Sequence, residues 1–387
     1  MTTVKLEHGL FLAPYHDISE SPTIALRRDL ELVEWIEQLG FTEAWFGEHH
    51  STGWETVSSP ELMIAAAAER TKRIRLGTGV VSLPYHNPLM VVNRIIQLDH
   101  MTMGRVMFGV GPGLLTTDAL MLGVDLKETR DMMAEAIEVI MPLLRGEQVT
   151  RKGRWFTLNK ARIHLMPYTQ PHPEVAVASA ITPSGGMLAG KYGFGMLCVA
   201  ATETSGFDAL GENWKIANQI AAEHGRTMNP QRLRLVAPMH LAESREKARA
   251  DVKEGLLSWC DYFDRIAPAG MRGLTGKGDP ADLLVNSGRA VIGTPEDAIT
   301  MIERLQAKQG DFGVLLIQAT NWADWEPTKK SYELYARFVM PYLAKVNKNR
   351  KDSFDHLVQD FDAVMQEREQ GAQKAFQQWQ DHQGGKS

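Results

Sequence analysis

The sequence has little cysteine and no long apolar run, and both absences exclude classes of protein. Its 387 residues include two cysteines, Cys198 and Cys260, which form no CxxC pair. A disulfide framework or a thiolate zinc site is therefore not expected, and both cysteines are interpreted as core residues. No window approaches 18 uninterrupted apolar residues, and the first residues lack the pattern of a secretory signal. We expect a cytoplasmic protein that makes no contact with membranes.

An excess of positive charge is also missing. The formal net charge is -5, which provides no basic surface for nucleic acid or for anionic membranes. The chain contains neither a GxxxxGK[ST] loop nor a GxGxxG loop, the two common nucleotide-phosphate motifs. With 44% hydrophobic and 23% charged residues, the composition is that of a globular protein with a sizeable core. The expected ligand is therefore a small molecule.

The sequence does contain eight short apolar segments of high β-propensity, separated by amphipathic stretches. The first intervening stretch, Thr23–Gly40, carries apolar residues at three- and four-residue spacing and ends in glycine, so it is predicted to be a helix. Eight strands that alternate with helices favour an α/β fold of the (β/α)8 TIM-barrel type over an open sheet. The eight predicted strands begin at Leu10, Glu43, Ile74, Val106, Glu174, Phe194, Arg234 and Phe312.

Two segments depart from this alternation. Residues 268–290, rich in glycine and proline, precede the last strand, and we expect a lid insertion within residues 260–290; an insertion without function is the alternative. The tail, residues 347–387, is charged and rich in glutamine, with apolar residues at helical spacing. The predicted organisation is a barrel over residues 1–346 followed by a helical tail over residues 347–387, which we expect to lie outside the barrel.

Polar residues that follow the strands are the candidates for chemistry, because barrel active sites lie at the carboxyl ends of the strands. Glu48, His49 and His50 follow the second predicted strand. Neighbours on an extended chain point to opposite faces, so at most one of the two histidines faces the barrel mouth, and this spacing predicts no metal site. A histidine at that position suits general acid–base chemistry. The alternative is a pair of surface histidines.

A second strand-end feature is the segment that opens a helix after the fifth strand. The amides of Ser184 and Gly185, with the hydroxyl of Ser179 nearby, are placed to bind a phosphate at a helix N-terminus. A tight turn that uses glycine only for its conformation is the alternative. Further upstream, Gly109 and Gly111 belong to a GVGPG segment in which small residues allow a flat ring to approach the backbone.

Large apolar side chains near the strand ends predict the lining of a substrate pocket. Few charged residues accompany them, which suits a small neutral substrate, although each residue taken singly is as consistent with the core. The predicted lining residues are Phe11, Tyr15, Trp54, Tyr85 and Met239.

Taken together, these segments resemble the bacterial luciferase-like, flavin-dependent monooxygenases. The resemblance extends over about residues 6–343. Within the family, the motifs APYH, GEHHSTGWE and SLPYHNP are most similar in sequence to the limonene 1,2-monooxygenase group. The segments that carry the resemblance are GFTEAWFGEHH (40–50), the block from SPELM to GVGPG (59–113), VASAITPSGGMLAGKYG (177–193) and VIGTPEDAITMIERL (291–305).

The resemblance implies a homodimeric barrel that uses reduced FMN or FAD together with O2. A separate NAD(P)H:flavin reductase would supply the reduced flavin, and the substrate would be small and apolar, such as a monoterpene like limonene. His49 would be the catalytic histidine, with Glu48 beside the same ring. Gly79 and Val80 match a position that often holds a non-proline cis peptide under the flavin ring. Ser179, Ser184 and Gly185 match the phosphate cradle.

One departure from the family pattern affects the cofactor. Bacterial luciferase carries a cysteine and an arginine in the loop that reads GVGPG here, so phosphate contacts from that arginine are missing and the choice between FMN and FAD stays open. Two other interpretations are a deazaflavin-dependent oxidoreductase on the same barrel and a flavin-binding relative without turnover. A sugar-phosphate enzyme would need a basic phosphate clamp, which the sequence does not reveal.

Overall fold

The computed structural model of the chain describes residues 4–12, 15–266 and 278–384. The chain divides into two compact units, Met1–Met340 and Pro341–Ser387, so the division falls a few residues before the predicted start of the tail. The first unit contains all the strands and is described first.

The first unit is built on a closed barrel of eight parallel strands, as the sequence predicted. The barrel closes because β10 pairs with β9 as well as with β12, which in turn pairs with β1. Each predicted strand start lies within one of these strands or next to it. In chain order the barrel strands are β1 (Glu7–Leu12), β2 (Glu43–Phe46), β3 (Arg75–Thr78), β5 (Val106–Gly111), β8 (Glu174–Ser179), β9 (Gly195–Cys198), β10 (Leu233–Leu241) and β12 (Val314–Ala319).

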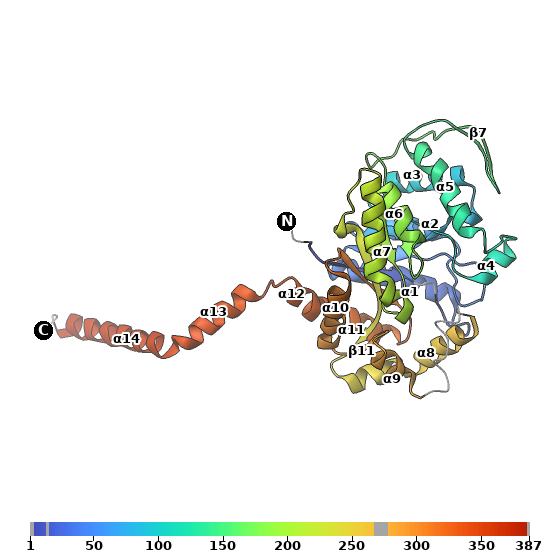
Figure 1. Cartoon of the computed structure of the whole chain (residues 1–387). Coiled ribbons are helices and arrows are strands. Elements are labelled where there is room, and N and C mark those ends of the chain that lie inside the picture. Colours follow the sequence, from blue (N-terminus) through green and yellow to red (C-terminus); the bar gives the residue numbers. More distant parts are fainter. Residues whose placement is uncertain (1–3, 13–14, 267–277, 385–387) are drawn as a thin grey trace. The chain divides into compact units, whose positions relative to one another are not determined.

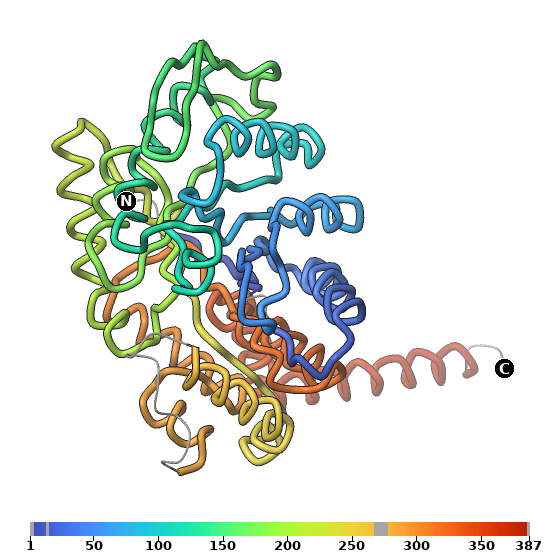
Figure 2. Tube along the Cα trace, turned by 90° about the vertical axis from the view of Figure 1, so that its right-hand side faces the viewer, coloured from blue at the N-terminus to red at the C-terminus, as the bar shows by residue number. Residues whose placement is uncertain are grey.

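Helices form the layer outside these strands (Figures 1 and 2). Helix α1 shows why the sequence pattern was informative: it begins at a proline and buries Val33 and Ile36 on one side. It is followed by Gly40, whose φ of 91° favours glycine. The other helices of this layer are α2 (Pro60–Arg70), α3 (Pro88–Met101), α5 (Thr129–Leu144), α6 (Ser184–Tyr192), α7 (Thr204–Glu223), α8 (Arg245–Ile266), α10 (Pro295–Gln309) and α11 (Trp325–Leu334); α1 spans Pro22–Gln38.

Several smaller elements lie in the connections. A short strand, β4 (Val81–Ser82), pairs with β5, and α4 (Thr116–Met121) follows β5. An antiparallel hairpin of β6 (Val149–Lys152) and β7 (Thr157–Ala161) follows α5 and was not predicted. Its side chains are mostly exposed, so it has no apolar segment that would have indicated strands.

The segment predicted to be a lid is partly helical. Residues 260–266 form the last turns of α8, and α9 spans Pro280–Asn286. Directly after it, β11 (Val291–Gly293) pairs with the end of β10. Residues 267–277 lie outside the described residues. The loop expected over residues 268–290 is therefore corrected to a helix in its second part, and β11 follows that segment.

A buried network of charges fills the amino-terminal end of the barrel. The guanidinium of Arg234 on β10 donates to both carboxylate oxygens of Glu43 on β2, at 2.7 and 2.8 Å. It also lies 2.9 Å from Glu174 on β8, which pairs with Arg75 on β3 at 2.6 Å. The side chains of Arg234 and Glu43 are each 1% exposed. Since these residues stand at the strand starts, the opposite end of the barrel is left for a cavity.

The second unit consists of helices, as predicted for the tail. It contains α12 (Met340–Leu343, at the boundary), α13 (Lys348–Gln359) and α14 (Phe361–Gly384). None of the described residues of α13 and α14 is buried, and Phe354, Phe361 and Trp379 are more than half exposed. No helix within the described part of the chain is both long and apolar enough to cross a membrane.

Candidate active site

A cavity of about 280 Å³ opens at the carboxyl ends of the barrel strands. Its floor is formed where β1, β2, β3, β8 and β12 end, and the last turns of α8 form one wall. Eight of the residues predicted from the sequence line it: Phe11, Glu48, His49, Gly79, Val80, Ser179, Ser184 and Gly185.

The bond between Gly79 and Val80 in the cavity wall is a non-proline cis peptide, at the position that the resemblance implied. Gly109 and Gly111, in contrast, do not line the cavity. A Cβ on Gly109 would lie 1.9 Å from the carbonyl oxygen of Thr78, and one on Gly111 would lie 2.4 Å from the side chain of Val80. These two glycines allow β5 to pack closely against the β3 end, so their predicted contact with a flat ring is corrected.

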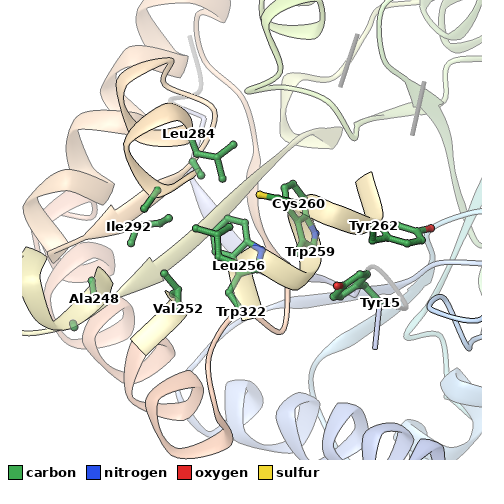
Figure 3. Close-up of a cluster of buried hydrophobic side chains, with 13 residues drawn as sticks. Tyr15, Ala248, Val252, Leu256, Trp259, Cys260, Tyr262, Leu284, Ile292 and Trp322 are labelled. Atoms are coloured by element: carbon green, nitrogen blue, oxygen red, sulfur yellow. The ribbon is translucent and has the colours of Figure 1, made fainter. Parts of the chain in front are cut away.

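Four of the five predicted substrate residues also lie outside the cavity lining. Tyr15 and Trp54 stack on each other with ring centroids 5.2 Å apart, and both pack against Tyr262 of α8. Figure 3 shows Tyr15 in this buried cluster beside Tyr262. Tyr85 lies under the backbone of Gly113, and Met239 is buried on β10. These aromatic and apolar side chains support the cavity walls from behind.

His49 is held between two carboxylates that come from different parts of the chain. Its Nδ1 lies 3.0 Å from Asp118 of α4, and its Nε2 lies 3.0 Å from Glu55 in the loop after β2. Burial alone lowers the pKa of His49, but Glu55 and Asp118 outweigh burial and raise the pKa to about 9. His49 is therefore protonated at neutral pH and has a proton to donate.

Asp118 organises the residues around His49, a role that no motif in the sequence indicated. Besides the His49 ring, it accepts hydrogen bonds from the backbone N–H of His50 at 3.0 Å and from the hydroxyl of Ser51 at 2.5 Å. Burial raises the pKa of Asp118, but the hydrogen bonds from His49, Ser51 and His50 outweigh it and lower the pKa. Asp118 stays ionised and fixes the course of the loop that carries His49.

Glu48 and His50 belong to a separate network. Glu48 accepts hydrogen bonds from His50 at 2.8 Å, from His86 at 2.6 Å and from the backbone N–H of Ser82 at 2.7 Å. Burial raises the pKa of Glu48, but the two histidines outweigh it and lower the pKa. Glu48 thus ties the loop after β2 to the loop after β3.

The three side chains of this network place ligand-type atoms within 4.8 Å of one another. The tautomer of His86 argues against a metal among them. Arg94 lies 3.4 Å from Nδ1 of His86, and because a guanidinium only donates hydrogen bonds, Nδ1 is the acceptor. Nε2 therefore carries the proton, which His86 donates to Glu48. The arrangement is a hydrogen-bond network, and His50 and His86 orient Glu48.

One part of the cavity lining fits a phosphate group. The hydroxyl of Ser179 is buried there without a hydrogen-bond partner among the described residues. The N-terminus of α6 lies beside it, held close because a Cβ on Gly185 would lie 2.6 Å from the carbonyl oxygen of Ala178. Arg130, in the first turn of α5, also lines the cavity and has no ion-pair partner within the described residues. The orphaned hydroxyl and the helix N-terminus form an anion site, and Arg130 adds an unpaired cation to the lining of the same cavity.

Comparison with known proteins identifies the family. The sequence-family model of the luciferase-like monooxygenases matches residues 6–311 of the chain. The chain belongs to the luciferase-like monooxygenase family. Limonene 1,2-monooxygenase of Rhodococcus erythropolis is 48% identical to it over 338 residues, which is 87% of each chain. The 4-hydroxyprotoasukamycin monooxygenase of Streptomyces nodosus subsp. asukaensis is 44% identical over 341 residues, covering 87% of this chain and 92% of that relative.

Solved structures of the family share the fold. The oxygenating constituent of 3,6-diketocamphane monooxygenase from Pseudomonas putida, solved with FMN, has a TM-score of 0.74 and 25% identity, with 88% of this chain and 98% of that one covered. An F420-dependent secondary alcohol dehydrogenase has a TM-score of 0.65 at 20% identity, which shows the fold alone. This luciferase-like chain is a flavin-dependent monooxygenase with the (β/α)8 barrel fold that the sequence predicted.

Proposed function

We propose that this chain is the oxygenating component of a two-component monooxygenase. It takes reduced FMN from a separate NAD(P)H:flavin reductase and uses O2 to oxygenate a small apolar substrate, with a monoterpene such as limonene as the first candidate. The names of the two relatives above and the FMN in the diketocamphane enzyme support this assignment. We further propose that the enzyme acts as a cytoplasmic homodimer.

The observation that carries the proposal is that one cavity joins a phosphate site to an acidic histidine. Ser179, Ser184 and Arg130 would hold the phosphate, and the wall at Gly79 and Val80 would face the ring. Bound reduced flavin would supply the electrons that activate O2. His49 would supply a proton at the ring end. A single phosphate site favours FMN over FAD.

The walls between these two ends are mostly apolar, as an apolar substrate requires. Helix α8 contributes three aromatic rings, which also shield the site from water. Of the charged residues in the lining, Glu203 is paired with Arg289 at 2.7 Å, which compensates its charge. The apolar lining side chains include Phe11, Leu114, Leu115, Met133, Val199, Trp259, Tyr262, Phe263 and Ile266.

The substitution Arg130→Met tests the phosphate site. We expect it to weaken binding of reduced FMN about tenfold, because one charge-assisted hydrogen bond at a solvent-accessible position is lost. Binding of reduced riboflavin, which lacks the phosphate, should not change. Anaerobic fluorescence titration with both flavins measures the difference. Arg145→Met, at the other end of α5, is the matched control. Equal affinity of the unmodified protein for reduced FMN and reduced riboflavin would contradict the assignment.

Turnover assays distinguish the other interpretations. A deazaflavin-dependent oxidoreductase would turn over at the same rate with and without O2. A non-catalytic relative would bind reduced FMN and form no oxygenated product in a screen of terpenes and ketones.

A further inference from the structure

Both ring nitrogens of His49 lie close to carboxylates. Asp118 lies on the Nδ1 side and Glu55 on the Nε2 side, each at 3.0 Å. The contact with Asp118 is a hydrogen bond, whereas Oε2 of Glu55 is buried and accepts no hydrogen bond from the described residues. A proton from His49 can therefore pass to a carboxylate, and Oε2 of Glu55 is the acceptor that is not already engaged.

Glu55 is the carboxylate that is placed to pass it on. Glu55 lines the cavity, whereas Asp118 does not and is only 1% exposed. Asp118 is also engaged by Ser51 and by the backbone of His50, which accounts for both of its oxygens. Oε2 of Glu55, the oxygen that faces His49, accepts no hydrogen bond from other described residues.

The other oxygen of Glu55 is held by helix α8. The hydroxyl of Tyr262 donates to Oε1 at 2.9 Å, and burial, the largest cause, raises the pKa of Tyr262 so that it stays protonated and keeps donating. Tyr262 is itself fixed by Tyr15, Trp54 and Phe263, with ring centroids 5.3 to 5.7 Å from its own. Figure 3 shows this tyrosine in the last turns of the helix, beside Tyr15. The aromatic cluster therefore positions the Glu55 carboxylate.

We propose that Glu55 carries the His49 proton into the cavity and that Tyr262 positions Glu55 for this transfer. The Nε2–H bond of His49 breaks and an O–H bond forms on Oε2 of Glu55; Glu55 then gives this proton to a basic oxygen atom bound in the cavity. His49 becomes neutral and keeps the proton on Nδ1, which stays hydrogen-bonded to Asp118. Water later restores the proton on Nε2. Glu55 is a catalytic residue in this scheme and Tyr262 a positioning residue. The proposal rests on the oxygenase function proposed above.

The substitution Glu55→Gln tests the proposal first without any flavin. Asp118, Glu55, the neighbouring His50, Glu48 and Tyr262 are the titratable groups around His49, and of these Glu55 and Asp118 raise its pKa. Loss of the Glu55 charge should lower the pKa of His49 by at least one unit, as measured by NMR on protein with ¹⁵N-labelled histidine and assigned with His49→Asn. Glu203→Gln is the matched control, since Glu203 also lines the cavity but pairs with Arg289. It should leave the pKa of His49 unchanged.

The second readout is turnover. Glu55→Gln should lower kcat about 100-fold with little change in the affinity for reduced FMN, and the alkaline limb of the pH profile should move to lower pH. Tyr262→Phe should lower kcat less and shift the same limb in the same direction. An unchanged His49 pKa in Glu55→Gln, or a kcat within twofold of the unmodified enzyme, would overturn the proposal. Absence of turnover in the unmodified enzyme would instead refute the oxygenase function, while the NMR result still decides whether Glu55 is coupled to His49.

Discussion

Replacing His49 with asparagine is expected to lower turnover about 10²- to 10⁴-fold, the usual contribution of a general acid. Asparagine is close to histidine in size near the backbone but cannot deliver a proton. The affinity for reduced FMN should stay within about twofold, because the residues proposed to hold the phosphate, Ser179, Ser184 and Arg130, are unchanged. Steady-state product formation and anaerobic flavin titration measure the two quantities separately.

The pH dependence of the unmodified enzyme should carry the same information. Interaction with Glu55 and Asp118 raises the pKa of His49 to about 9, so the acid form is present below that pH and is lost above it. Turnover should hold from neutrality up to about pH 9 and then fall. A fall near pH 6.5, the ordinary value for histidine, would mean that the two carboxylates do not hold the charge.

Replacing Arg234 with methionine is expected to lower the free energy of unfolding by about 3–5 kcal/mol. The substitution keeps much of the side-chain volume but leaves two buried carboxylates, Glu43 and Glu174, without their shared cation. Chemical denaturation monitored by circular dichroism measures the loss. Arg70→Met is the control: Arg70 pairs with Glu34 at the surface, and its loss should cost less than about 1 kcal/mol. Similar losses in both variants would contradict the importance of the buried network.

The same network should make the protein sensitive to acid. Burial raises the pKa of Glu174, but Arg234 and Arg75 outweigh it and lower the pKa from 4.5 to about 2. A group with a lowered pKa stabilises the fold above its ordinary value, and this contribution is lost as the pH falls from 4.5 toward 2. The Arg234→Met variant should lose less stability over this range than the unmodified protein does.

The barrel could be predicted from the sequence because each strand of a closed parallel barrel is buried on both faces. Such strands appear as short apolar segments, and the segment from Val106 and the one from Phe312 correspond directly to β5 and β12. The β6–β7 hairpin could not be predicted in this way, since its residues alternate little in polarity and lie at the surface.

The site was only partly predictable, and the reason is distance along the chain. Glu48 and His49 stand directly after a strand, where the barrel geometry alone makes them candidates. Asp118 and Tyr262 reach the same place from 69 and more than 200 positions away, on helices whose sequences carry no distinguishing motif. Arg130 was likewise hidden in an ordinary helix start, so its place in the cavity lining, and the phosphate contact proposed for it, could be found only in three dimensions.

The misassigned residues have a physical explanation as well. A glycine accommodates either a ligand or a neighbouring strand, and Gly109 and Gly111 accommodate strands. An aromatic residue near a strand end packs equally well in a pocket wall or behind it. Tyr15 and Trp54 are of the second kind: they support Tyr262, which reaches the cavity in their place.

The most direct test of the proposed oxygenase is to bind reduced FMN to the protein without oxygen and then mix the complex rapidly with oxygenated buffer while recording the flavin absorbance. We predict reoxidation that is clearly slower than that of free reduced FMN, passes through a transient absorbing species and is altered in His49→Asn. Reoxidation at the rate of free reduced FMN, with no transient and no effect of His49, would contradict the assignment of this cavity as the site of oxygen activation.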